Sequence, residues 1–458
     1  MFEKRYEKEK ITRYIEIFFI AFIGIQPILD FVSYFGNSFS LLVRVFAMGV
    51  GLIYLLVNNK VQNNFVKLIY IILLSLFIVA NTINNYLVKD PYSLMQEVTY
   101  GIKTIYVIEM LLIYSTVFIS IKSKIKWGNV VEKLIVLNIF VINLIMLLAE
   151  WTSTGNSSYD YPGKEGHSGW FFSANDLSAL LALSFGILLL HLINSKKVAY
   201  KLLLFFLVPI TIWSLLTVGT KVGLGAIIIG IAITLFVVLI RLIKKEKEWL
   251  NLCFLLLISI FAMIYVPQSA VGNNLGLDSL FSDDDKKVEE VKPNEEGNQE
   301  PTQEEIDENQ FDIKEQVMTN KVLSGRDQFL DNAIQDWKEA PLSQWILGMG
   351  PGGNYPEKLK LIEMDFLDLF FGYGILGSIL LFAPFLIMGI IIVYSLFKNK
   401  FKKFDARVFI SAIQLGMGVG IAAFAGHIFL NPSSGIYFAV IFSYLYTIVA
   451  TSSKNCNE

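Results

Sequence analysis

The feature that most constrains this chain is a series of apolar runs, each long enough to cross a membrane. A bilayer core about 30 Å thick is spanned by a helix of roughly 20 apolar residues. We count twelve such runs, which begin near residues 15, 38, 65, 98, 130, 174, 202, 222, 249, 374, 405 and 432. The sequence therefore predicts an all-α polytopic membrane protein with about 12 transmembrane helices and a large outer-face loop that carries amphipathic helices.

Charge and motif content exclude several classes of protein. The chain is 54% hydrophobic and 17% charged, and its 38 Lys and Arg residues nearly balance its 40 Asp and Glu residues. A surface that follows nucleic-acid phosphates needs a clear excess of positive charge, so no nucleic-acid partner is expected. The two cysteines stand far apart, and the CxxC and HExxH patterns of metal sites do not occur. We therefore expect no metal ion and no cofactor.

The positive charges predict how the chain is oriented. An even number of spans places both termini on one side, and cytoplasmic segments carry an excess of Lys and Arg. With a cytoplasmic N-terminus, most Lys and Arg residues fall in the inner segments, and most others fall in one long loop, which is exempt from this rule. The first run follows a basic segment but lacks a signal-peptide cleavage site, which favours a retained helix. The expected location is the cell membrane, multi-pass, with both termini cytoplasmic.

The spans divide the chain into three parts. Residues 1–266 hold transmembrane helices 1–9, residues 267–361 form the large extracytoplasmic loop, and residues 362–458 hold an interfacial helix and transmembrane helices 10–12. Within the loop, residues 282–310 are acidic and lack aromatic side chains, which predicts a disordered acidic spacer. Residues 324–361 are expected to form the helical, catalytic part of the loop.

Two amphipathic helices are predicted in that catalytic part. The first starts at Ser324, carries apolar side chains at helical spacing and ends at Pro341. The second starts at Pro356, a residue type favoured in the first turn, and continues into the tenth apolar run. Both helices would lie at the outer interface of the membrane.

Two cations stand where an anion could bind. Arg326 falls at the start of the first loop helix, where free N–H groups and the helix dipole favour an anion. The alternative is a surface pair with Asp327 or Asp331. Lys221 falls in the very short link between the seventh and eighth runs, so it either extends to the headgroups or meets an anion. Arg44 lies in an apolar run and is expected to face the bundle interior.

Glycines and carboxylates mark the region before the tenth run. The stretch 348–353 lacks the Gly-Lys-Ser/Thr ending of a nucleotide-binding loop, so it is either a plain turn or a close backbone approach to a ligand. On a helical period Asp365 and Asp368 share a face, whereas Glu363 lies about 200° from Asp365. All three carboxylates therefore cannot address one substrate. His427 is expected outside the membrane, where an ordinary interfacial residue is the alternative to a site residue.

Together these stretches resemble the O-antigen ligase and Wzy-type polymerase superfamily. The resemblance rests on Ser324-Gly-Arg326, on the segment from Pro341 to Gly348-x-Gly350, and on Glu363-Met-Asp-Phe-Leu followed by Gly374-Ile-Leu-Gly377. Further agreement comes from the segment between Gly169 and Ala179 that holds Asn175, from Leu216 to Gly223 around Lys221, and from Gly426-His427 to Pro432. It covers the architecture throughout and motifs from about residue 169 to 435.

The resemblance implies a membrane glycosyltransferase of surface-polysaccharide biosynthesis. Such an enzyme transfers or polymerises glycan from an undecaprenyl-diphosphate-linked donor to a glycan or lipid-linked acceptor, on the outer face of the cytoplasmic membrane. It uses neither metal nor nucleotide, and polysaccharide-assembly proteins are candidate partners. The resemblance leaves open whether the chain is a polysaccharide polymerase or a ligase.

The resemblance also assigns roles to residues. Arg326 matches one of the family's arginines that hold the diphosphate, and Lys221 takes the place of the second, with the charge but without the bidentate fork. Glu363 stands where the family's ligases often have a His, so the general base would be a carboxylate. With these three as catalytic residues, substrate-binding residues are expected at Asp365, Asp368, Asn175, Gly348, Gly350, His427 and Arg44.

A lipid-linked oligosaccharide flippase or another polysaccharide transporter is the alternative function. Such a protein would share the number of spans and the charges within the membrane. It would more often show two similar halves with interrupted helices at matching positions. The sequence shows no such repeat, and the candidate site residues fall outside the membrane midplane, which favours the enzyme.

Overall fold

The computed structural model describes residues 2–36, 38–58, 61–122, 127–159, 163–277, 326–354 and 361–450. In these ranges the regular structure is helical, apart from one isolated bridge between Ser157 and His167. They include 11 helices long and apolar enough to cross a membrane, or up to 12 if a bent pair counts as one span. The predicted all-α polytopic architecture is confirmed. The acidic segment 282–310 lies outside the described residues.

The helices follow one another along the chain with short links. Up to the end of the cavity-forming half they are α1 (Phe2–Gly24), α2 (Gln26–Tyr34), α3 (Phe39–Val57), α4 (Asn64–Val88), α5 (Leu94–Ile121), α6 (Trp127–Trp151), α7 (Ala174–Asn194), α8 (Val198–Thr217), α9 (Lys221–Ile243) and α10 (Trp249–Tyr265). They continue with the 3₁₀ turn Val266–Gln268, α11 (Ala270–Leu275), α13 (Arg326–Glu339), α14 (Leu342–Leu347), α15 (Asp365–Lys398), α16 (Ala406–Phe424) and α17 (Pro432–Ala450).

The first predicted span is the bent pair formed by α1 and α2. The two helices meet at an angle of 54°, with Ile25 between them and Pro27 in the first turn of α2. Proline has no N–H to continue the hydrogen bonds of α1, but its fixed φ suits the first turn of a new helix. The bend explains why one apolar run in the sequence becomes two helices.

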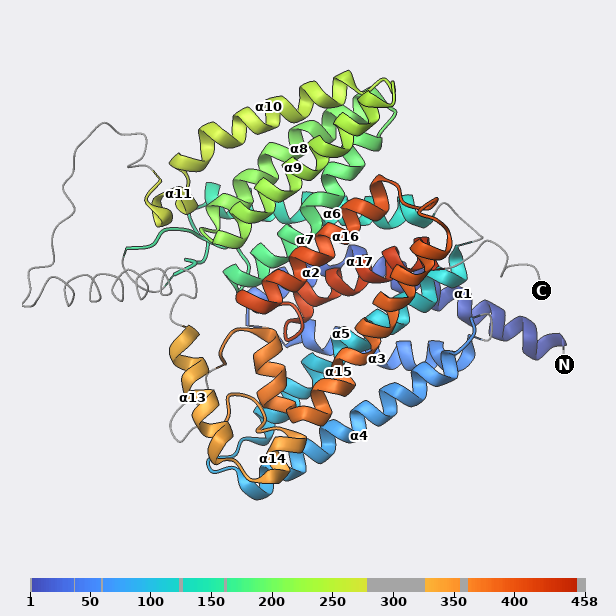
Figure 1. The fold of residues 1–458 in the computed structure, drawn as a ribbon, viewed down its shortest axis with the longest axis vertical. Coiled ribbons are helices and arrows are strands. Elements are labelled where there is room, and N and C mark those ends of the chain that lie inside the picture. Colours follow the sequence, from blue (N-terminus) through green and yellow to red (C-terminus); the bar gives the residue numbers. More distant parts are fainter. Residues whose placement is uncertain are drawn as a thin grey trace, which may run out of the picture.

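Three helices form the centre of the bundle. The most apolar windows of α5, α7 and α17 are 89%, 94% and 72% buried, whereas those of the other single spans are 22–44% buried. Figure 1 shows the remaining long helices arranged around this centre. Glycine permits the closest approaches: a Cβ on Gly418 of α16 would lie 2.7 Å from Phe438 of α17 and 2.8 Å from Leu183 of α7.

Short helices cover one end of the bundle, where α11, α13 and α14 lie together in Figure 1. Helix α13 corresponds to the first predicted loop helix, although Ser324 and Gly325 lie outside the described residues. Its Trp337 stacks on Trp345 of α14 and contacts the rings of Phe370 and Phe371 of α15, at centroid distances of 6.4, 5.2 and 5.6 Å. These aromatic contacts hold α13 and α14 against the start of α15.

The second predicted loop helix is wrong for residues 361–364. These residues are not helical, and α15 begins only at Asp365, while residues 355–360 with Pro356 lie outside the described ranges. The Asp368 carboxylate accepts the backbone N–H groups of Ile362 at 2.8 Å and Met364 at 3.0 Å. Because a side chain takes up these N–H groups, the preceding backbone turns away from the helix.

Candidate active site

A cavity of about 1110 Å³ lies at the end of the bundle that carries the short helices. Its walls come from α7, α9, α16, the start of α13 and the loops that join them. The cavity brings together five residues that the sequence singled out, which are Arg326, Lys221, Glu363, Asn175 and His427. The other five candidates are absent from its lining, namely Asp365, Asp368, Gly348, Gly350 and Arg44.

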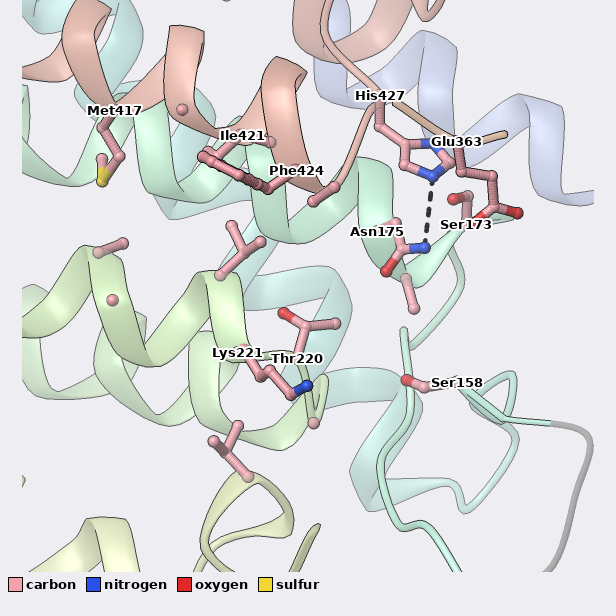
Figure 2. A pocket seen from close by; sticks show the side chains of 18 of the residues that line it. Ser158, Ser173, Asn175, Thr220, Lys221, Glu363, Met417, Ile421, Phe424 and His427 are labelled. Carbon is pink, nitrogen blue, oxygen red and sulfur yellow. Dashed lines mark hydrogen bonds between the residues drawn. The ribbon is translucent and has the colours of Figure 1, made fainter. Parts of the chain in front are cut away.

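Lys221 is placed by the tight link between α8 and α9. The Thr220 side chain caps α9 by accepting the N–H of Gly223 at 3.4 Å, and its hydroxyl lies 2.6 Å from that of Ser178 in α7. Gly219 has φ +83°, and a Cβ there would collide with the carbonyl oxygen of Glu165. Figure 2 shows Lys221 and Thr220 across the cavity from Asn175 and His427. The ammonium therefore stands in the first turn of a helix that opens onto the cavity.

Positive charge dominates the polar part of the cavity. Lys164, Lys221 and Arg326 line it, whereas Glu363 is the one carboxylate among the described lining residues. The charges of Lys164 and Arg326 both act on Lys221, and the Lys164 ammonium also lies 5.3 Å from the ring centre of Tyr159. Such a cluster attracts an anion, and a phosphate group would relieve the repulsion between the cations.

Arg326 is the first residue of α13 and has unused donors. One terminal nitrogen donates to the Glu363 carboxylate at 3.1 Å and lies 3.5 Å from the carbonyl oxygen of Ala425. Its Nε is buried without a hydrogen-bond partner among the described residues. A buried N–H group without a partner is unfavourable, so a ligand acceptor in the cavity would stabilise this side chain.

Glu363 and His427 both have backbone conformations that are rare for residues with a side chain. Their φ values are +62° and +70°. Their segments also lie close together, since a Cβ on Gly426 would lie 2.7 Å from the Glu363 carbonyl oxygen. The Glu363 side chain is 43% exposed and faces the cavity. Unfavourable backbone conformations of this kind concentrate at functional sites, where surrounding contacts enforce them.

His427 is fixed by side chains at the start of α7. Its Nδ1 lies 2.8 Å from the Asp176 carboxylate, and its Nε2 lies 3.3 Å from the Asn175 amide nitrogen, the contact dashed in Figure 2. Burial alone would lower the pKa of His427. The hydrogen bond and charge of Asp176, with the charges of Asp365 and Glu363, raise that pKa above the usual value for histidine.

Asp365 and Asp368 position backbone instead of lining the cavity. The Asp365 carboxylate accepts the N–H groups of His427 at 3.0 Å, Ile428 at 2.7 Å and Phe429 at 2.7 Å. Asp368 binds the residues around Glu363, as described above. The predicted common face of the two aspartates therefore serves two loops, and the helical angle computed for Glu363 does not apply because α15 starts after it.

The glycine stretch and Arg44 also have structural partners. Gly348 has φ +98°, and a Cβ there would collide with the Gly372 carbonyl oxygen, while the N–H of Gly350 donates to that carbonyl at 2.9 Å. The stretch thus packs on α15 as a turn. Arg44 donates to the Asp30 carboxylate at 2.5 Å and to the Ser433 hydroxyl at 3.3 Å, inside the bundle.

The sequence analysis did not single out two residues of this region. Lys164 belongs to an irregular loop, where neither periodicity nor a motif marks it. Asp176 stands three residues after Ser173, whose side chain caps α7 by accepting the Asp176 N–H at 3.3 Å. An acidic residue three positions after a serine cap was a usable signal for the start of α7, but it carries no information on the contact with His427.

The family model for O-antigen ligase-like membrane proteins matches residues 12–451. The chain belongs to this family. Family membership gives it a role in O-antigen or surface-glycan assembly and makes it a glycan-transferring membrane enzyme, not a transporter. Neither a curated protein nor a solved structure matches the chain. The cavity with its three cations is therefore the candidate active site of an O-antigen ligase-like enzyme.

The raised pKa of His427 predicts how glycan transfer depends on pH. The ion pair with Asp176 is fully present below the pKa of an ordinary histidine and is lost as pH rises through the raised pKa. Transfer should therefore decline along an alkaline limb that reports His427. Asp176→Asn removes the charge that raises the pKa, so it should move this limb to lower pH, measured as the rate of glycan transfer against pH. Asp331→Asn on the exposed face of α13 is the control, and an unmoved limb in Asp176→Asn would refute the assignment.

Proposed function

We propose that the protein transfers or polymerises glycan from an undecaprenyl-diphosphate-linked donor to a glycan or lipid-linked acceptor. The reaction takes place on the outer face of the cytoplasmic membrane, with both termini in the cytoplasm. In this proposal Arg326, Lys221 and Lys164 hold the diphosphate, and Glu363 is the general base. The positive charges neutralise the diphosphate, so the reaction needs no metal ion.

The observation that carries this proposal is the amphipathic shape of the cavity. The cations line one part of it, and the rest is an apolar groove between α9 and α16. Met417, Ile421 and Phe424 follow one another along α16 on this groove in Figure 2. Gly225, Gly416 and Gly420 widen it, since a Cβ on each of them would meet nothing within 4 Å. A diphosphate joined to an isoprenoid chain has the same division into an anionic and an apolar part.

The chemistry follows from which groups surround the reacting atoms. The acceptor hydroxyl oxygen forms a bond to the anomeric carbon of the donor sugar, and the bond from that carbon to the diphosphate breaks. Glu363 takes the proton of the hydroxyl. The negative charge that develops on the leaving diphosphate is stabilised by Arg326 and Lys221, whose charges are fixed before the reaction. His427, held by Asp176, borders the same space and would orient the acceptor.

The apolar groove provides a test of the donor assignment. Gly420→Leu places a side chain in open space within the groove, so the protein should fold but use its lipid-linked donor poorly. Gly389→Leu is the matched control, since a Cβ there also meets nothing within 4 Å and Gly389 lies outside the cavity lining. The assay measures transfer from an undecaprenyl-diphosphate-linked glycan by purified protein. Equal rates for both variants would contradict the proposed lipid groove.

A further inference from the structure

A second cavity, of about 880 Å³, lies between α6 and α8 and is separate from the candidate active site. The wall from α6 repeats at helical spacing along one face of the helix. It comprises Lys133, Val136, Leu137, Phe140, Leu144 and Leu147. Leu137, Phe140 and Leu144 are 45–49% exposed, so the groove opens toward the surroundings of the bundle.

The wall from α8 repeats in the same way. It comprises Lys197, Tyr200, Leu203, Leu204, Leu207 and Ile210. Hydrogen bonds join the two helices farther along, from Asn143 to the Thr211 hydroxyl at 2.8 Å and from the Ser214 hydroxyl to Asn143 at 2.9 Å. Asn143 is the one lining side chain with an amide, and these bonds satisfy it within the protein. The groove between them is otherwise apolar.

The two lysines stand at one end of this groove. Lys133 lies in the second turn of α6 and Lys197 is the N-cap of α8, and both side chains are exposed. Both helices run from this end toward the candidate active site, where α8 leads into the capped start of α9. The lysines therefore lie at the membrane face opposite the active site. No acidic side chain lines the groove among the described residues.

The neighbouring charges behind the groove are already paired. Glu132 is buried and binds the Arg407 guanidinium at 3.0 Å and the Tyr444 hydroxyl at 2.6 Å. It also lies 3.1 Å from His191, whose other ring nitrogen is 3.2 Å from the Tyr200 hydroxyl. This network fixes Tyr200 at the mouth of the groove and leaves Glu132 facing its own partners instead of the two lysines.

We propose that this groove is a binding site for a diacyl phospholipid with an anionic headgroup. The acyl chains lie along the apolar stripes of α6 and α8, and the headgroup phosphate meets Lys133 and Lys197. The charge at the mouth decides the occupant: two lysines at headgroup level, without an acidic neighbour in the lining, favour an anionic lipid over a zwitterionic one or an apolar protein helix. The site is independent of the proposed catalytic function.

The test uses purified full-length protein in neutral detergent and measures Tm during titration with phosphatidylglycerol, with phosphatidylcholine of the same chains, and with inorganic phosphate. Phosphatidylglycerol should raise Tm at lower concentrations than phosphatidylcholine, and phosphate alone should not raise it. The double variant Lys133→Gln/Lys197→Gln should weaken the phosphatidylglycerol effect by roughly thirtyfold in concentration. Lys244→Gln/Lys247→Gln removes two exposed lysines at the same membrane face, outside the groove, and should behave as the wild type.

A second measurement places the lipid in the groove. Leu203→Trp on the groove wall and Leu239→Trp on α9 introduce tryptophan at exposed positions, 59% and 47% exposed, one to two turns from the same membrane face. Phosphatidylglycerol with brominated chains should quench the tryptophan at 203 more than brominated phosphatidylcholine does, and position 239 should show no such preference. The proposal is overturned if both lipids act alike at 203, if the lysine double variant keeps the preference, or if phosphate alone reproduces the stabilisation.

Discussion

Glu363→Gln is expected to slow glycan transfer by roughly 10²–10⁴-fold, the range typical for loss of a general base. Gln has nearly the same size as Glu and its amide oxygen can still accept the hydrogen bond from Arg326, which spans 3.1 Å in the wild type. It cannot take a proton from the acceptor hydroxyl at neutral pH. The measurement is the transfer rate of purified protein with saturating lipid-linked donor.

Asp331→Asn is the matched control for this change, because it neutralises an exposed carboxylate of α13 outside the cavity lining. Its transfer rate should equal that of the wild type. The assignment of the base fails if Glu363→Gln transfers glycan at nearly the wild-type rate. A normal rate for Glu363→Gln together with an inactive, folded Asp176→Asn would move the base to His427.

Arg326→Gln is expected to lower the transfer rate by roughly 10²–10³-fold, as when one donor that stabilises a developing negative charge is removed. The guanidinium lies beside Glu363 and has a buried N–H without a partner among the described residues, so it is placed to bind the leaving diphosphate. Arg326→Lys should be intermediate, since it keeps the charge but loses the planar fork. Rates are compared at equal amounts of folded protein.

Arg241→Gln serves as the control for the loss of an arginine. Arg241 lies in the last turn of α9, at the opposite end of that helix from the cavity, and binds Asn194 at 2.8 Å. This variant should keep normal transfer. A folded Arg326→Gln that transfers glycan as fast as Arg241→Gln would show that the guanidinium does not hold the diphosphate.

The membrane spans could be predicted from the sequence because each depends only on a local apolar run. The start of the eighth run near residue 222 and the observed start of α9 at Lys221 illustrate this agreement. The family resemblance was likewise confirmed over residues 12–451. The bend at Ile25 was less accessible, because Pro27 stands inside an otherwise continuous apolar run.

The cavity could be predicted only in part. Arg326 and Lys221 were found because each begins a helix, a property that the local sequence reveals. The function of Asp365 was not accessible, because its carboxylate binds backbone groups of residues 427–429, more than sixty positions away. Glu363 was assigned to a helix because the rule of helical periodicity cannot register that Asp368 withdraws the preceding N–H groups.

Binding of the lipid-linked donor, measured separately from its transfer, tests the central claim most directly. Wild-type protein, Glu363→Gln and Arg326→Gln are placed in nanodiscs, and each is titrated with an undecaprenyl-diphosphate-linked glycan. The account predicts that Glu363→Gln binds the donor as tightly as the wild type without transferring its glycan, while Arg326→Gln binds it more weakly. Donor binding of equal strength in Arg326→Gln and the wild type, or no binding to the wild type, would contradict the account.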